Sequence, residues 1–199
     1  MTITGRRAQA KAQKRARICA AADELFRAQG YAGTTTQQVA DVADVAAGTV
    51  FTYAASKPEL LMMVMNHRLR TELARGMAAA EDVTDPLAGI MTLLTPLLEL
   101  AAADRETFVL FVREVLFGNE GEHRAESQAA IDQLTTSIGA VVQRAPGHRS
   151  ELDAEAVGRA VLSVVLIELN RIRRGRTAPN RELVANQVEL VLKGALNAR

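Results

Sequence analysis

The side chains best suited to contact a nucleic acid lie close together in the sequence, between Thr34 and Leu61. Two short apolar patterns separated by a tight turn at Asp44 run through this stretch, which is the arrangement of a helix-turn-helix. Hydroxyl and amide groups can hydrogen-bond to bases or phosphates, and small residues let a helix approach the duplex closely. We expect base contacts from Thr36, Gln37, Gln38, Thr49 and Thr52, with close approach at Ala47 and Gly48.

Positive charge gathers in the same part of the chain. Residues 1–57 hold eight basic and four acidic side chains, a net charge of +4, whereas the remainder holds sixteen basic and nineteen acidic ones, a net charge of −3. A basic head on a mildly acidic body is expected when only the head meets a polyanion. We expect phosphate contacts from Arg6, Arg7, Tyr53 and Lys57, although a solvated, disordered tail is an equal alternative for residues 1–10.

Patterns that would indicate other chemistry are absent from the sequence. The three histidines are scattered, and there is no HExxH, no Cys/His metal spacing, no GxSxG and no glycine-rich phosphate loop. We therefore expect no enzyme activity, no metal and no cofactor. Cys19 lies in an apolar helical pattern, where we expect an inert buried thiol. We find no apolar run as long as a membrane span and no signal-peptide core, and so expect a soluble, cytoplasmic protein.

The apolar spacing is helical throughout, and we predict an all-α fold of about nine helices. Gly30 is expected to stop the first helix, Asp44 interrupts the helix-turn-helix, and Pro96 predicts a kink or break. The expected division is a DNA-binding domain over 1–57 and a sensing and dimerisation domain over 58–199. We expect helices over about 11–29, 57–80, 86–102, 105–118, 123–144, 154–174 and 181–196. Between the first two lie two short helices, one capped within the Thr34–Thr36 run and carrying Val39, Ala40 and Ala43, the other with the apolar pattern Val45, Val50 and Phe51.

The first third of the chain resembles the TetR family of transcriptional regulators. The resemblance rests on residues 17–30 (RICAAADELFRAQG), the Thr34–Thr36 run, Val39-Ala40, Val45, residues 48–51 (GTVF) and Ser56-Lys57-x-Glu59-Leu60-Leu61. It implies a homodimer that binds a double-stranded, commonly palindromic DNA operator. It further implies that the protein is commonly a repressor, released when an unidentified small molecule fills a pocket in the C-terminal half.

Four positions depart from the family pattern. The turn has Asp44 where glycine is usual, Ala46 replaces the usual serine cap, Ala47 replaces a frequent lysine or arginine, and Ala54 replaces an aromatic residue. The recognition helix therefore carries no basic side chain. These departures support an alternative hypothesis, a helical small-molecule-binding or scaffold protein of the same fold with weak or lost operator binding.

The C-terminal half offers candidate pocket residues, although plain core packing is the default interpretation of each. Glu168 stands in an otherwise apolar helical stretch, where a carboxylate needs a partner. A structural ion pair, with Arg113 or with an arginine across a dimer interface, ranks ahead of a ligand contact. The pocket candidates are Met91, Leu94, Phe108, Phe111, Phe117 and Glu168.

The last two predicted helices are the candidates for the dimer interface. The helix that begins near Asp153 shows two apolar faces, one more than core packing requires, and the final helix carries an apolar stripe. Pairing both helices with their symmetry mates would give a four-helix interface. The residues expected at this interface are Leu162, Leu166, Leu169, Val184, Val188 and Val191.

Overall fold

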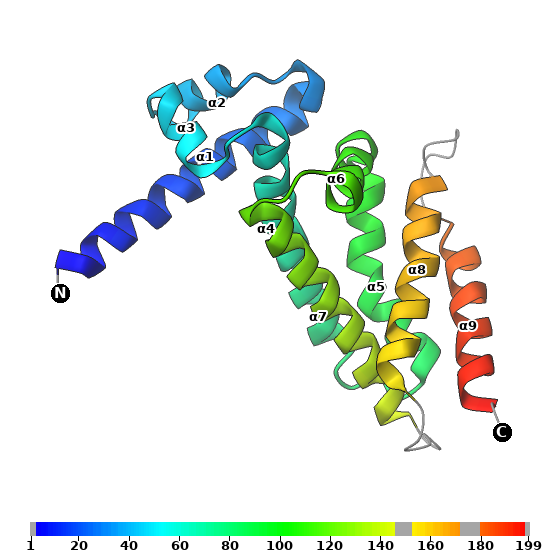
Figure 1. The fold of residues 1–199 in the computed structure, drawn as a ribbon. Helices are drawn as coiled ribbons and strands as arrows, with labels where there is room; N and C mark the ends of the chain where they lie inside the picture. Colours follow the sequence, from blue (N-terminus) through cyan, green and yellow to red (C-terminus); the bar gives the residue numbers. More distant parts are fainter. Residues whose placement is uncertain (1–2, 146–152, 172–179, 198–199) are drawn as a thin grey trace.

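The structure is a computed structural model that describes residues 3–145, 153–171 and 180–197. These residues form α-helices and no strand, which confirms the predicted all-α class. Figure 1 shows a small head made by α1 (Ile3–Gly33), α2 (Thr36–Val42) and α3 (Ala47–Tyr53) above a body of longer helices. The N-terminal part of α1 projects away from both parts. The chain passes from head to body along α4 (Lys57–Ala79).

Local signals in the sequence fix the turns of the head. Gly30 adopts φ 75°, a left-handed conformation, where we expected the first helix to stop, although helical residues continue to Gly33. Thr35 caps α2 by accepting a hydrogen bond from the backbone N–H of Gln38, whose side chain bonds back to the backbone of Thr35. Asp44 takes φ 52° in the turn, a conformation that aspartate tolerates better than most residues. Ala46 precedes α3 without any side-chain cap.

The body consists of α5 (Pro86–Ala103), α6 (Arg105–Phe117), α7 (Glu122–Arg144), α8 (Ala154–Arg171) and α9 (Arg181–Asn197), packed with α4. α7 and α8 lie so close together that a Cβ atom at Gly158 would collide with the carbonyl oxygen of Thr135. Five of these six helices, all but α7, are capped at the first turn by a side chain that accepts a hydrogen bond from a backbone N–H group. These caps are Ser56, Asp85, Asp104, Asp153 and Asn180.

Some boundaries differ from those expected. α1 begins at Ile3 rather than near residue 11, so residues 3–10 are helical and not a disordered tail. α5 runs through Pro96 without a break. The expected end of α8 near residue 174 lies outside the described residues.

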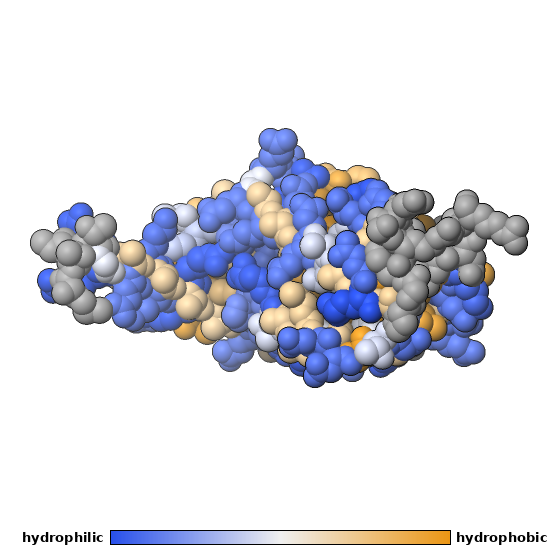
Figure 2. Space-filling view, turned by 90° about the horizontal axis from the view of Figure 1, so that it is seen from below, coloured by the Kyte–Doolittle hydropathy of each residue, from blue (hydrophilic) through white to orange (hydrophobic). Residues whose placement is uncertain are grey.

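One helix of the described ranges contradicts our expectation about membrane-length segments. α5 is long and apolar enough to cross a membrane by length and composition alone. It packs against α4, α6, α7 and α9, as the core helix of a soluble bundle does. From below, the molecule shows a mostly hydrophilic surface in which apolar residues are scattered in small groups (Figure 2).

Candidate nucleic-acid interface

The recognition helix α3 is anchored by one side and exposed on the other. Val50 is fully buried in the head, and its position fixes which residues point outward. Gly48, Phe51 and Thr52 are exposed, whereas Ala47, Thr49 and Tyr53 are half-buried. The hydroxyl of Thr52 donates to the carbonyl oxygen of Gly48 at 3.1 Å. The structure therefore brings the expected α3 residues to a free surface that a major groove could accept.

The amide side chains on α2 already take part in hydrogen bonds within the head. Gln37 donates to Asp41 at 2.8 Å. Gln38 uses its amide oxygen to accept from the backbone N–H of Thr35 at 2.8 Å. Thr36 is half-buried.

The cations of the head lie at its edges. Lys57 Nζ donates to the carbonyl oxygen of Ala32 at 3.3 Å and lies 4.5 Å from the centre of the Tyr31 ring. Arg6 and Arg7 are exposed on the projecting part of α1. Arg17 lies 3.9 Å from Asp44 at the turn, and both side chains are largely exposed. None of these charges is on α3 itself.

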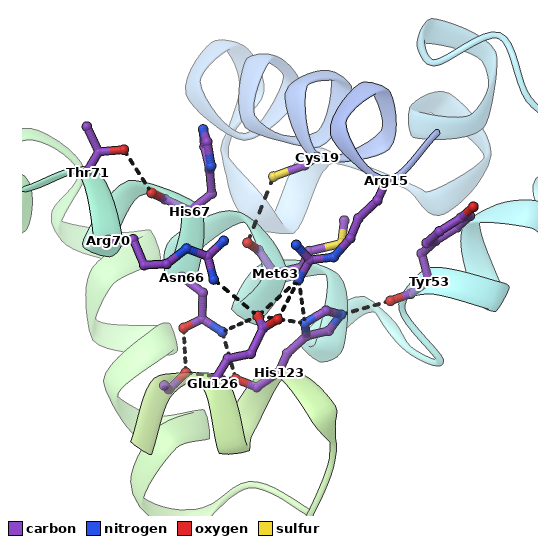
Figure 3. A network of polar contacts seen from close by, with 11 residues as sticks. Arg15, Cys19, Tyr53, Met63, Asn66, His67, Arg70, Thr71, His123 and Glu126 are labelled. Carbon is purple, nitrogen blue, oxygen red and sulfur yellow. Dashed lines mark hydrogen bonds and ion pairs between the residues drawn. The ribbon is translucent and has the colours of Figure 1, made fainter. Parts of the chain in front are cut away.

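A network of polar contacts connects the C-terminal end of α3 to the body (Figure 3). Nε2 of His123, in the first turn of α7, lies 2.8 Å from the carbonyl oxygen of Tyr53, the last residue of α3. Because a carbonyl only accepts, Nε2 carries the proton in this bond. Nδ1 lies 3.2 Å from Glu126 and 3.5 Å from Arg15 of α1. The histidine side chain is almost completely buried.

Glu126 joins the three parts of this network. Its carboxylate accepts from Arg15 at 2.8 Å and lies 3.7 Å from Arg70 of α4. Burial alone would raise the pKa of Glu126, but the hydrogen bond with His123 and the charges of Arg15, His123 and Arg70 outweigh it and lower the pKa below its usual 4.5. The carboxylate thus stays ionised between α1, α4 and α7.

Asn66 of α4 completes the connection inside the body. Its amide nitrogen donates to the carbonyl oxygen of His123 at 2.7 Å, and its amide oxygen accepts from the hydroxyl of Ser127 at 2.6 Å. Asn66 and Ser127 are both buried. Because buried polar groups that are fully hydrogen-bonded fix a unique packing, this arrangement holds the first turn of α7 on α4.

A second ionic connection lies on the other side of α4. The guanidinium of Arg68 is buried and pairs with Asp23 of α1 and, at 3.2 Å, with Asp104 at the start of α6. Nearby, burial and the negative charge of Asp23 raise the pKa of the Cys19 thiol to about 11, which keeps it protonated and unreactive. Head and body are therefore joined by buried or partly buried charges on two faces of α4.

The body contains a narrow apolar cavity of about 50 Å³ that opens in part to solvent. All of its lining side chains are hydrocarbon, and they come from five helices, α4 to α8. The lining residues are Leu69, Leu73, Leu97, Phe108, Phe111, Val112, Val115, Leu116, Ala130, Ile131, Leu134, Leu162, Leu166 and Leu169.

This cavity includes only part of the expected set of pocket residues. Phe108 and Phe111 line it, whereas Met91, Leu94 and Glu168 are not among its lining residues. Phe117 is 81% exposed, because it is the last residue of α6 and points away from the core. Glu168 is buried on α8, and Arg113, its expected partner, is exposed and pairs with Glu114.

The expected dimer residues need a correction. Leu162, Leu169, Val184 and Val188 are buried within the protomer, so these side chains cannot form an outer contact surface. α8 packs on α7 and α9, and α9 packs on α5. These contacts within the protomer bury the apolar stripes that we assigned to a dimer interface. Leu166 and Val191 are half-buried. The exposed large apolar side chains of these helices are instead Ile167 and Leu190.

Sequence reasoning missed the network residues. His123, Glu126 and Ser127 occur at i, i+3 and i+4 of a helix, so they share one face, and this spacing was the available signal. Their partners on α1 and α4 are 56 or more residues away in sequence, as the contacts of Arg70 and Arg15 with Glu126 and of Asn66 with His123 show. Spacing within one helix could not reveal them.

Comparisons with known proteins agree with this geometry. Residues 18–63 match the sequence profile of bacterial regulatory proteins of the tetR family. The chain is 31% identical to the HTH-type transcriptional regulator TtgR of Pseudomonas putida over 173 residues, 80% of each protein. It is 30% identical to the HTH-type transcriptional regulator RutR of Escherichia coli over 70% of this chain and 61% of that protein.

The fold is shared with solved structures. Thermus thermophilus FadR, a TetR-family repressor in complex with lauroyl-CoA, has 23% identity and a TM-score of 0.73 over 93% of this chain and 96% of that one. PfmR, a TetR-family regulator also from Thermus thermophilus, has 26% identity and a TM-score of 0.59 over 89% and 97%.

The fold and the head thus define a helix-turn-helix transcriptional regulator. The chain belongs to the tetR family of bacterial regulatory proteins.

Replacing Glu126 tests the electrostatics of the network. Because its pKa in the folded protein is lowered, the carboxylate stabilises the fold above pH 4.5, and this stabilisation is lost as the pH falls further. Glu126→Gln should therefore unfold at lower urea concentration than the wild type at pH 7, and the difference should shrink toward pH 3. Glu155→Gln, which alters an exposed pair with Arg159 on α8, is the control. A difference independent of pH would contradict the assignment.

Proposed function

We propose that the protein is a homodimeric repressor that binds a two-fold symmetric operator through α3 of each protomer. The observation that supports this best is an exposed recognition helix whose last carbonyl oxygen, on Tyr53, is held by His123 of the body. A helix that reads DNA must be held rigidly, because small displacements change its base contacts. We infer that the protein is a transcriptional regulator rather than an enzyme. It would act in the cytoplasm, where bacterial DNA is found.

We further propose that a small, apolar molecule in the cavity releases the protein from DNA. The lining offers hydrocarbon contacts only, which favours an apolar ligand. The cavity touches α6 and α7. Asp104, which caps α6, pairs with Arg68, which in turn pairs with Asp23 of the head, and His123 in the first turn of α7 contacts Tyr53 of the head. Thermus thermophilus FadR forms a complex with lauroyl-CoA, so this fold can accept such a ligand.

The outer faces of α8 and α9 are the proposed dimer surface. Ile167 is 59% exposed and Leu190 is 68% exposed, on two helices that pack against each other. Ser163 shares the outer face of α8 at helical spacing, and Gln187 and Gly194 share that of α9. Burying exposed apolar residues of this size against a second copy would favour association.

A second candidate function is a ligand-binding protein of this fold with weak operator binding. The uncapped start of α3 supports it, because Ala46 makes no side-chain hydrogen bond there. Loss of such a cap costs about 0.5–2 kcal/mol of helix stability. Operator binding distinguishes the two candidates.

Gel shift against the DNA that flanks the protein's own gene tests operator binding, with unrelated duplex as competitor. The repressor hypothesis predicts a shift that survives the competitor and weakens steeply with salt. Replacing Arg6 and Arg7 together by alanine should reduce the slope of log K against log[salt] by about 0.9 for each phosphate that is no longer neutralised. Arg159→Ala, an exposed cation of the body, is the matched control and should leave the slope unchanged. Equal affinity for unrelated duplex would favour the second candidate.

The dimer surface can be tested with Ile167→Glu and Leu190→Glu. Both side chains are exposed in the protomer, so the variants should fold but sediment as monomers, because association would bury unpaired charges. Met77→Glu alters an exposed apolar residue on α4 and should remain dimeric. If both interface variants sediment as dimers, the contact surface lies elsewhere.

A further inference from the structure

The outer face of α3 has an unusual chemical composition for a helix that reads DNA. Its sequence, AGTVFTY, contains no charged, amide or imidazole side chain. Gly48 and Thr52 point away from the buried Val50, and Phe51 lies beside them with 48% of its surface exposed. The face that would enter a major groove is therefore made of an aromatic ring, small apolar groups and hydroxyls.

Three of the polar side chains near this face already form hydrogen bonds inside the head. The hydroxyl proton of Thr52 goes to the Gly48 carbonyl oxygen, so the side chain has no proton left to donate to a base. Gln37 and Gln38 each have one end of the amide engaged, on Asp41 and on the backbone of Thr35. Bidentate pairing with adenine uses the amide oxygen and one amide N–H. The present bonds hold both amide groups against the head, and both glutamines lie on α2 rather than on α3.

No neighbouring group prevents α3 from approaching a base pair closely at Gly48. A Cβ atom added at Gly48 would meet nothing within 4 Å, so the helix presents bare backbone beside Phe51 and Thr52. In the major groove, the one apolar group that distinguishes a base pair is the 5-methyl group of thymine, and phenylalanine, threonine methyl and alanine are the side chains that contact it. Guanine and adenine are instead recognised by bidentate side chains, which α3 lacks.

We propose that α3 selects its operator by contact with thymine 5-methyl groups, with Phe51 as the main specificity-determining residue and Thr52 beside it. The inference rests on the proposed operator binding and specifies the chemistry that α3 recognises. Burial of one methyl group changes affinity by about fourfold. Several such contacts in two half-sites then give useful discrimination without any charged base reader on α3.

The experiment uses the full-length protein and a library of random 30-base-pair duplexes, from which bound sequences are selected. The best duplex is then remade with deoxyuridine in place of thymidine at one position at a time, which removes only the methyl group. A parallel series carries 7-deazaguanine, which removes the N7 acceptor of guanine. Dissociation constants are measured for the wild type, for Phe51→Ala and for Met77→Ala, an exposed apolar residue on α4 outside the head.

The proposal predicts that at least one uracil substitution in each half-site weakens wild-type binding about threefold or more. At that position Phe51→Ala should bind the thymine and uracil duplexes equally, whereas Met77→Ala should still distinguish them. The 7-deazaguanine series should have little effect. Selected duplexes that depend on guanine N7 and ignore uracil would overturn the methyl-reading proposal while leaving operator binding intact. A selection that enriches no sequence would overturn the proposed operator binding itself, and the inference with it.

Discussion

The hydrogen bond from His123 to the Tyr53 carbonyl oxygen is the contact on which the placement of the recognition helix depends. α3 has only seven residues, no side-chain cap at its start and one fully buried side chain, Val50. Such a helix has little stability of its own, so its orientation comes from tertiary contacts. His123 supplies one at the C-terminal end, and Glu126, Asn66 and the first turn of α7 hold that histidine in place.

This arrangement explains how a small head and an apolar cavity can work as one unit. The cavity lies between helices that begin at Asp104 and close to His123, so its walls and the links to the head belong to the same rigid elements. A ligand can shift an equilibrium only by its differential affinity for the two states. Filling the cavity would favour an arrangement of α6 and α7 in which the cavity is larger. A movement of the first turns of these helices would displace α1 and α3, because charged or hydrogen-bonded contacts connect them.

The sequence predicted features that are local and missed those that are not. The break at Gly30, the turn at Asp44, the missing cap at Ala46 and the starts of the body helices follow from residue types within a few positions. The two apolar faces of α8 could not be assigned from spacing, because a face buried against α7 and one buried against a second copy have the same pattern. The cavity lining and the network of His123 are made by residues from four or more helices. The periodicity of one helix does not show which distant residues it will contact. The length of α1 exceeded the expectation because its first turns are polar and give no apolar signal.

The body positions the recognition helix through His123, and the affinity for operator DNA depends on that position. Dissociation constants for the operator should be compared for the wild type, His123→Leu and His123→Gln, with circular dichroism to establish that each is folded. Glutamine retains a donor for the Tyr53 carbonyl, whereas leucine does not. Loss of this hydrogen bond should weaken DNA binding by about tenfold in the leucine variant, with most of the affinity restored in the glutamine variant. Operator binding that is the same in all three proteins would contradict the account.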